Sequence, residues 1–164
     1  MHVCSLRLLA AAMLSAVLLL ASGLARAQER IVWTDLELVD GRVLKASELA
    51  GKTVIVEFWA SWCPFCKKQN PHFQKLYEAS RKDPKFAVLS FSIDKTPAAA
   101  RDYLASHRYT FPAALAGAQS ERWFGKRKTL PEIFVVDPQG RIVHAELGEI
   151  FEEDMAALAR FAAR

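Results

Sequence analysis

One stretch of the sequence, residues 53–71, reads TVIVEFWASWCPFCKKQNP. Its first half, Thr53 to Ala60, is apolar and rich in β-branched residues, as expected of a strand buried on both faces of a sheet. Its second half places Cys63 and Cys66 directly before a helical pattern that continues towards Arg81. This pair of cysteines, between a buried strand and a helix, decides the fold and the chemistry that we expect.

The start of a helix is a favourable place for a thiolate. Its backbone N–H groups lack helical partners and lie at the positive end of the helix dipole, so the pKa of a thiol at Cys63 is lowered there. Cys66 lies about one turn further on, where it can attack a mixed disulfide formed at Cys63. Pro64 fits the first turn because the N–H that it lacks would have no helical partner.

A purely structural disulfide is the alternative use of these cysteines. Closing so short a loop removes only about 2 kcal/mol of unfolded-state entropy, against about 4.7 kcal/mol for a 100-residue loop. Cys63 and Cys66 are the only cysteines after Cys4, and a single bridge would stabilise the chain more if it closed a longer loop. Redox chemistry is therefore the favoured interpretation.

The remaining pattern predicts a hairpin, a β-α-β-α unit, a second hairpin and a final helix. The expected elements are strands over 36–39 and 42–44 around Asp40-Gly41, a strand over 86–93, a helix from Thr96 to about His107, a short helix over 120–124, strands over 133–136 and 142–144, and a helix over 151–163. This order predicts an α/β domain of three layers with a mixed central sheet.

Residues 1–27 have the features of a secretory signal peptide. Arg7 supplies a positive n-region, residues 8–20 are almost wholly apolar, and Ala25-Arg26-Ala27 is an A-x-A cleavage site. The alternative is an uncleaved membrane anchor, because the apolar stretch over 8–24 reaches the short limit of a membrane span. In both cases we expect residues 28–164 to form one domain outside the cytoplasm.

The charge balance argues against nucleic-acid binding. The chain has 22 basic and 18 acidic residues, and loss of Arg7 and Arg26 with the signal peptide leaves 20 basic residues, a net charge of about +2. So small a charge also gives no reason to expect binding to an anionic membrane surface. Membrane contact is therefore expected only through an uncleaved N-terminal segment. The sequence gives no basis for an oligomeric state, and a monomer is the default expectation.

The segment FWASWCPFCKK, Phe58 to Lys68, resembles the active-site segment of thioredoxin-like proteins, and among these the exported TlpA/ResA-like disulfide reductases. Pro71 matches the proline that kinks their first active-site helix. The tripeptide Leu130-Pro131-Glu132 and the following IFVVD are similar to their cis-proline loop and the next strand. The resemblance covers nearly all of residues 28–164 and implies a thioredoxin fold, α/β/α with a central mixed sheet and an N-terminal β-hairpin extension.

The resemblance also implies roles for individual residues. Cys63 is the nucleophile, Cys66 the resolving cysteine, and Pro131 the cis-proline that faces them. The residues implied at the substrate-binding surface are Trp62, Pro64, Phe65, Leu130 and Pro131. The implied activity is thiol–disulfide exchange with protein disulfides in the periplasm, most simply as a reductase, with no bound cofactor and with a membrane or periplasmic thiol as electron donor.

Glu57 is a further candidate for the catalytic site. It lies in an otherwise apolar strand, six residues before Cys63, where thioredoxins carry a buried Asp. A buried carboxyl has a raised pKa and can exchange a proton with Cys66. Some relatives carry an acid three residues after the second cysteine, where this chain has Gln69. The alternative is that Glu57 lies at a strand edge and faces water or a lysine.

Other functions remain open at this level. The dipeptide Pro64-Phe65 does not distinguish a reductase from a disulfide oxidase or isomerase. A copper-binding metallochaperone would combine both cysteines with a histidine, but the histidines at 72, 107 and 144 have no tight spacing to them, so no metal site is expected.

Two other groups of residues are expected to be structural. Trp59 is predicted to pack in the core rather than to take part in the chemistry. The basic residues at 122, 126, 127 and 128 are predicted to lie on a solvated loop.

Overall fold

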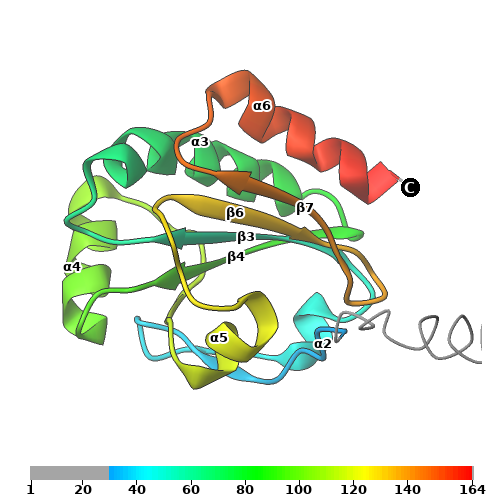
Figure 1. Ribbon diagram of the computed structural model, residues 1–164, viewed down its shortest axis with the longest axis horizontal. Coiled ribbons are helices and arrows are strands. Elements are labelled where there is room, and N and C mark those ends of the chain that lie inside the picture. Colours follow the sequence, from blue (N-terminus) through cyan, green and yellow to red (C-terminus); the bar gives the residue numbers. More distant parts are fainter. Residues whose placement is uncertain (1–29, 164) are drawn as a thin grey trace, which may run out of the picture.

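The computed structural model describes residues 30–163, which are built around a five-stranded mixed sheet (Figure 1). In spatial order the strands are β5 (Ala113–Leu115), β4 (Phe86–Ser92), β3 (Thr53–Trp59), β6 (Glu132–Val136) and β7 (Ile142–Leu147). β3 pairs in parallel with β4 and antiparallel with β6. The strand that leads to the cysteines is therefore central, and all of its residues are buried. The predicted signal peptide lies outside the described residues.

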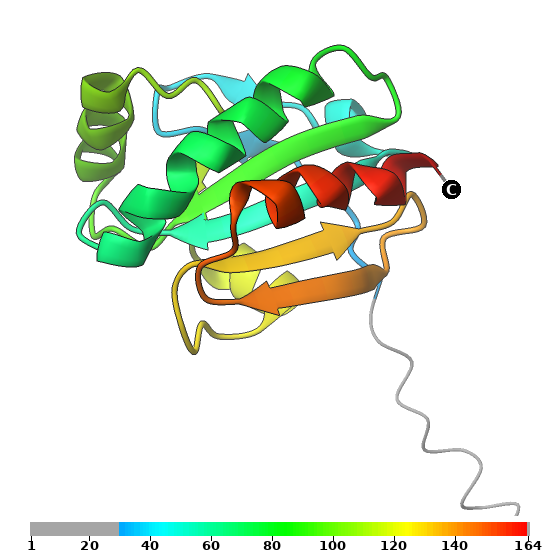
Figure 2. The same cartoon turned by 90° about the horizontal axis from the view of Figure 1, so that it is seen from above.

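Helices cover both faces of this sheet (Figures 1 and 2). One face carries α3 (Pro64–Ser80), α4 (Pro97–His107), α6 (Glu152–Ala157) and the 3₁₀ helix η2 (Leu158–Ala163). The other carries α5 (Ala118–Phe124), α2 (Ala46–Leu49) and the antiparallel hairpin of β1 (Leu36–Glu37) and β2 (Val43–Leu44). The prediction of three layers with a mixed sheet and an N-terminal hairpin is confirmed.

The alternation of side chains along β3 decides which residues face the cysteine helix. Ile55 and Trp59 belong to the core under α3 and α4, whereas Val56 and Phe58 belong to the core under α5. Because successive strand side chains point to opposite faces, Glu57 lies on the same face as Ile55 and Trp59. It is therefore directed towards the helix that begins at the cysteines.

Two helices begin as the sequence predicts. In α4 the Thr96 hydroxyl accepts a hydrogen bond from the Ala99 N–H at 3.3 Å, and Pro97 occupies the first turn. In α3 the cap residue is Cys63 itself, followed by Pro64. The helix that carries the cysteines thus starts with a sulfur atom in the position of a capping oxygen.

The structure departs from the sequence predictions at several elements. The sequence did not predict β5 or α2; β5 is a strand because Ala113 and its neighbours pair with β4 and the Ala113 carbonyl accepts from the Val39 N–H at 2.8 Å. β7 extends to Leu147, three residues beyond the predicted end. The terminal helix changes to 3₁₀ geometry at Leu158.

The N-terminal segment is attached to the sheet at the end remote from the cysteines. The Ile31 N–H donates to the Gly140 carbonyl in the β6–β7 turn at 2.7 Å. Gly140 has a φ of +79°, and a Cβ there would meet the Ile31 carbonyl oxygen at 2.3 Å, so the close approach requires glycine. This turn follows Val136, which pairs with Val54 near the start of β3.

Candidate active site

Cys63 and Cys66 are joined in a disulfide at the start of α3, with their Cα atoms 5.3 Å apart. The Cys66 N–H donates to the Cys63 sulfur at 3.2 Å. Cys63 retains 3% of its exposure and Cys66 has none. In the reduced protein this N–H and the helix dipole would stabilise a thiolate at Cys63, which is also the sulfur that a partner can reach.

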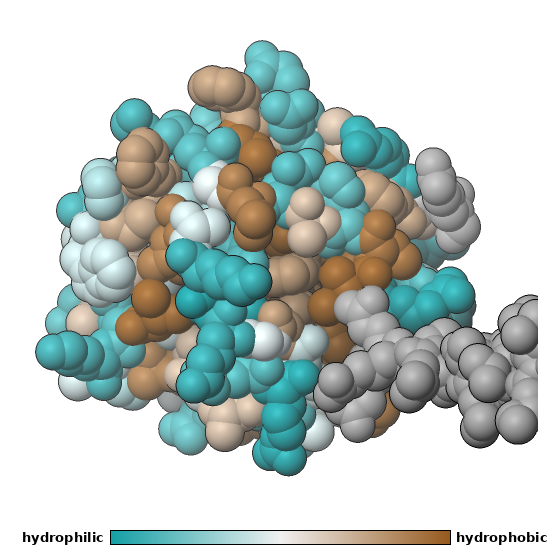
Figure 3. Space-filling view, in the orientation of Figure 1, coloured by the Kyte–Doolittle hydropathy of each residue, from teal (hydrophilic) through white to brown (hydrophobic). Residues whose placement is uncertain are grey.

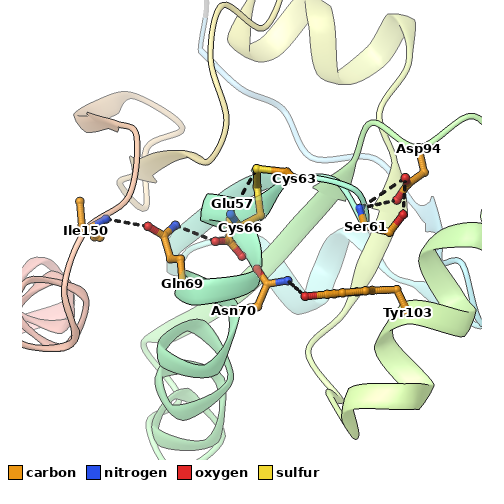
Figure 4. Close-up of a disulfide and its surroundings, with 9 residues drawn as sticks. All are labelled: Glu57, Ser61, Cys63, Cys66, Gln69, Asn70, Asp94, Tyr103 and Ile150. Carbon is orange, nitrogen blue, oxygen red and sulfur yellow. Dashed lines mark hydrogen bonds between the residues drawn. A yellow bond between two sulfur atoms is a disulfide. The ribbon is translucent and has the colours of Figure 1, made fainter.

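Asp94 holds the loop that leads into the helix (Figure 4). Its carboxylate, at the end of β4, accepts from the Ser61 N–H at 3.0 Å and from the Ser61 hydroxyl at 2.8 Å. The Ser92 hydroxyl donates to the same carboxylate at 2.7 Å. In the sequence, Asp94 directly follows the predicted strand over 86–93, and it was not assigned a role there. An acid at the carboxyl end of a strand adjacent to β3 was the signal that could have identified it.

Glu57 is completely buried behind the disulfide, so the alternative of a solvent-facing residue is wrong. Its Oε1 accepts a hydrogen bond from Gln69 Nε2 at 2.7 Å. Burial raises the pKa of Glu57 from its ordinary 4.5 to about 8, and the hydrogen bond from Gln69 opposes that shift only in part. A carboxyl with this pKa can either give or take a proton near neutral pH.

Gln69 and Asn70 complete a buried polar cluster on the inner side of α3 (Figure 4). Gln69 Oε1 accepts from the Ile150 N–H at 2.8 Å, and Asn70 Nδ2 donates to the Tyr103 hydroxyl at 3.3 Å. In the sequence, Gln69 stands out only as a departure from the relatives, and Asn70 was not predicted to take part. The available signal was helical spacing, since positions three and four after Cys66 lie on its side of the helix.

The Leu130–Pro131 peptide bond is cis, the geometry that the family resemblance implies. Pro131 is buried and Leu130 is half-buried. Because Glu132 pairs with Phe58, Pro131 lies opposite the last residue of β3, next to the start of the cysteine loop. The Pro131 carbonyl accepts from the Gly148 N–H at 2.9 Å, which joins this loop to the segment after β7.

The aromatic residues beside the cysteines divide into core and surface. Trp59 is completely buried, as predicted, and its indole N–H donates to the Ser90 hydroxyl at 3.1 Å. Trp62 and Phe65 are 62% and 52% exposed, and Pro64 between the cysteines is also exposed. On the face seen in Figure 3, apolar side chains alternate with polar ones. The exposed rings around the disulfide are thus available to a partner.

The prediction of a solvated basic loop is wrong for Arg127. Its side chain is 11% exposed and forms an ion pair with Glu132 at 2.5 Å. Its guanidinium also donates to the Gly125 carbonyl at 2.7 Å and lies over the Phe58 ring at 4.0 Å. Arg127 is buried because it compensates a buried carboxylate and the carbonyl oxygens that end α5. The other three basic residues of this stretch are exposed.

The histidines are dispersed over the domain. His72 lies near Glu152, His107 contacts the Tyr103 carbonyl, and His144 contacts Glu146. In the part of the chain that the structure describes, no group of three or more His, Cys, Asp or Glu side chains is arranged to hold a metal ion.

Comparisons with known proteins agree with this geometry. The Redoxin family profile matches residues 26–159. The thiol-disulfide oxidoreductase ResA of Bacillus thuringiensis is 29% identical over 124 residues, which cover 76% of this chain and 69% of that protein. ResA of Bacillus subtilis is 26% identical over 117 residues, covering 71% and 65% of the two chains.

Solved structures show the same fold. A putative thiol:disulfide interchange protein DsbE from Chlorobium tepidum is 26% identical with a TM-score of 0.66, and the match covers 83% of this chain and 92% of that one. A thioredoxin-family interchange protein from Chlorobium tepidum TLS has a TM-score of 0.74 at 21% identity, over 84% and 97% of the chains.

Proposed function

This chain belongs to the Redoxin family as a TlpA/ResA-like member and is a thiol–disulfide oxidoreductase, and we propose that it reduces disulfide bonds of exported proteins in the periplasm. The observation that carries the proposal is the position of Cys63 as the cap of α3, with the Cys66 N–H 3.2 Å from its sulfur. Cys66 and Glu57 lie buried directly behind it. This arrangement supports Cys63 as the attacking thiolate, Cys66 as the resolving thiol and Glu57 as the proton acceptor.

The first step is attack by the Cys63 thiolate on one sulfur of the substrate disulfide. A bond forms between Cys63 and that sulfur, the substrate disulfide bond breaks, and the second substrate sulfur leaves as a thiolate. The Cys66 N–H supports the Cys63 thiolate before the attack. The product of this step is a mixed disulfide.

Resolution requires that Cys66 lose its proton. The ionised Glu57 carboxyl takes this proton, and the Cys66 sulfur then attacks Cys63 and displaces the remaining substrate sulfur as a thiolate. Two electrons have passed to the substrate, and the protein is left with the disulfide seen in the structure. Re-reduction by a membrane or periplasmic thiol follows the same path in reverse, with neutral Glu57 returning the proton to Cys66.

The substrate-binding surface in this proposal consists of the exposed residues around Cys63 and the cis-proline loop. Trp62, Pro64 and Phe65 offer exposed apolar surface on the cysteine side. Leu130 and Pro131 border it from the loop before β6. A protein chain is favoured as the substrate because exposed Trp62, Pro64 and Phe65 lie beside a nearly buried sulfur.

The periplasmic location rests on the A-x-A motif at residues 25–27 and the apolar segment before it. No helix between residues 30 and 163 has the length and apolar character that a bilayer span requires. Fractionation of cells that express the full chain, with N-terminal sequencing of the product, tests this location. A product that begins at Gln28 in the periplasmic fraction is expected, and an intact N-terminus in the membrane fraction would contradict cleavage.

The direction of electron flow is tested by the reduction potential of the Cys63–Cys66 pair. Equilibration in thiol/disulfide buffers, followed by tryptophan fluorescence, should give a value near or below about −250 mV, on the thioredoxin side of the scale. A value above about −150 mV would contradict the reductase and make the protein an oxidant.

The roles of the two cysteines are tested with single substitutions. Cys63→Ser should abolish turnover of a protein disulfide such as insulin. Cys66→Ser should also stop turnover but accumulate a mixed disulfide at Cys63, detectable by mass spectrometry. Accumulation in the Cys63→Ser variant instead would reverse the assignment.

A further inference from the structure

Gln69 is held between a main-chain N–H and the buried carboxyl (Figure 4). Its Oε1 accepts from the Ile150 N–H at 2.8 Å, and its Nε2 donates to Glu57 Oε1 at 2.7 Å. Gln69 and Glu57 are both completely buried. The side-chain amide therefore has a hydrogen-bond partner at each end and no exposure to solvent.

The main-chain partner decides how this amide is oriented. The Ile150 N–H can only donate, so the Gln69 atom that faces it must be the carbonyl oxygen. The NH₂ group must then face Glu57, and Glu57 Oε1 must accept in both protonation states of the carboxyl. In a neutral carboxyl the carbonyl oxygen is the better acceptor, so Oε1 is the carbonyl oxygen and the hydroxyl is at Oε2.

We propose that Gln69 is a positioning residue that assigns the transferable proton of Glu57 to Oε2. The inference rests on the proposed proton-transfer role of Glu57. Among residues 30–163, Glu57 Oε2 has no hydrogen-bond partner, and neither has Asn70 Oδ1. No donor therefore occupies Oε2, which leaves this oxygen available for the proton that Glu57 exchanges with Cys66.

The surroundings of Glu57 allow its titration to be observed. The ionisable groups that face it are the two cysteines of α3, Tyr103 of α4 and Tyr109 of the loop that follows α4. Its neighbours across the sheet, Ser90 on β4 and Ile133 on β6, carry no charge. Burial raises the pKa of Tyr103 to about 12, and burial also raises the pKa of Tyr109. In the oxidised protein, Glu57 is therefore the one of these groups that titrates near neutral pH.

The first experiment reads the position of the proton by infrared spectroscopy of the oxidised protein at pH 6. The band that disappears in Glu57→Gln identifies the carbonyl stretch of neutral Glu57. In Gln69→Met this band should move to higher frequency, because the carbonyl oxygen loses its hydrogen-bond donor. An unchanged band would place the proton on Oε1 and overturn the proposal.

A matched control uses another glutamine of the same helix. Gln74 also bridges α3 to main-chain groups, its Oε1 accepting from the Thr110 N–H at 2.8 Å and from the Phe111 N–H at 3.3 Å. Its Nε2 donates to the side chains of Glu78 and Thr110, which lie at the surface and not at the cysteines. Gln74→Met should leave the Glu57 band unchanged. An equal shift in both variants would show a general effect on α3 and overturn the specific role of Gln69.

The second experiment measures the pH dependence of resolution. Reduced protein is mixed with one equivalent of 5,5′-dithiobis(2-nitrobenzoate), and the second release of thionitrobenzoate reports the attack of Cys66 on the mixed disulfide. Gln69→Met should raise the midpoint of this rate by about one pH unit, because the Glu57 anion loses a donor. A midpoint equal to that of the wild type would overturn the proposal.

A second variant covers the case that Gln69→Met fails to fold. Gln69→Glu keeps the shape and the acceptor for Ile150 but places a second carboxyl against Glu57. The two carboxyls should share a proton, so the profile should show two steps. A single step at the wild-type midpoint would overturn the role of Gln69. Unimpaired resolution in Glu57→Gln would instead contradict the proposed function on which the inference rests.

Discussion

Two buried glutamates on adjacent strands have opposite surroundings. Glu57 on β3 faces α3 and the cysteines, whereas Glu132 on β6 pairs with Phe58 and faces α5. Glu57 is hydrogen-bonded to the neutral amide of Gln69. Glu132 is ion-paired with Arg127, whose guanidinium also packs on Phe58. The same residue type thus has a neutral partner on one face and a cation on the other.

The difference shows how a partner modifies the effect of burial on the pKa of a carboxyl. Burial raises the pKa of Glu57 to about 8, and no cation opposes the shift. Burial also raises the pKa of Glu132 and outweighs the Arg127 guanidinium, which acts in the opposite direction. Glu57 is therefore suited to exchange a proton, whereas Glu132 and Arg127 together hold the cis-proline loop against the sheet.

Removal of Arg127 should have the largest effect on stability, because it breaks the buried ion pair with Glu132. Arg127→Met leaves the Glu132 carboxyl buried without its cation, and we expect the free energy of unfolding to fall by about 3–5 kcal/mol in urea denaturation. Arg127→Lys is the control that keeps the charge but not the forked geometry, and it should lose less. A loss below about 1 kcal/mol would mean that the pair behaves like a surface ion pair.

Removal of the Glu57 carboxyl, which has no cation as partner, should affect the rate of disulfide exchange instead. In Glu57→Gln the shape and the bond from Gln69 are kept, but no proton can be accepted, so resolution of the mixed disulfide should slow about 100-fold. Stopped-flow measurement with reduced protein checks this. Glu78→Gln, at an exposed position of the same helix, should retain the wild-type rate. Equal rates in both variants would contradict the role of Glu57.

The buried Glu57 carboxyl should make the stability of the fold depend on pH. Because the pKa of Glu57 is about 8 in the fold and ordinarily 4.5, the folded protein holds the extra proton between these values. The free energy of unfolding of the oxidised protein should therefore decrease as pH rises from about 4.5 to 8, by at most about 1.4 kcal/mol per pH unit from this group.

Glu57→Gln should remove the part of this slope that comes from Glu57, while the raised pKa of Glu132 leaves a slope of the same sign. Asp137 should not contribute to the slope between pH 4.5 and 8. Its hydrogen bonds lower its pKa despite partial burial, so the stability that it contributes is lost only at lower pH. Urea denaturation at pH 5, 6, 7 and 8 provides the comparison. Equal slopes for the wild type and Glu57→Gln would show that the carboxyl is already ionised in the fold.

The smallest effect is expected when both members of the ion pair are replaced. Arg127→Met combined with Glu132→Leu removes the buried charges together, and the free energy of unfolding should stay within about 1 kcal/mol of the wild type. Double-mutant analysis of urea denaturation measures the difference from the single variant. A double variant as unstable as Arg127→Met alone would show that the guanidinium acts through packing rather than through the carboxylate.

The sequence predicted those elements whose signals are local. The apolar run over 53–60, the Thr96-Pro97 helix start and the Asp40-Gly41 turn each depend on a few adjacent residues, and the structure has the expected element at each place. The cis bond at Leu130–Pro131 followed from the family resemblance and not from its own residues. These features together were sufficient for the layer order and for the position of the disulfide.

The features that escaped prediction depend on partners distant in the sequence. β5 has three residues and becomes a strand only by pairing with β4. Arg127 belongs to a basic stretch typical of a solvated loop, and only the fold brings it over Phe58. Gln69 meets a main-chain N–H that is 81 positions further along the chain. No local composition encodes such contacts, so the division of roles between the two glutamates emerges only from the fold.

The bond between Ile31 and Gly140 gives the domain a direction. It fixes the entry of the chain beside the β6–β7 turn, whereas the disulfide lies past the opposite ends of β3 and β6. A support, a fusion partner or a tether joined ahead of residue 31 would hold the domain at the end remote from the cysteines. The end that carries Cys63 and Cys66 would then face outwards, where a protein substrate can reach it. Two molecules fixed side by side would present their cysteines in the same direction.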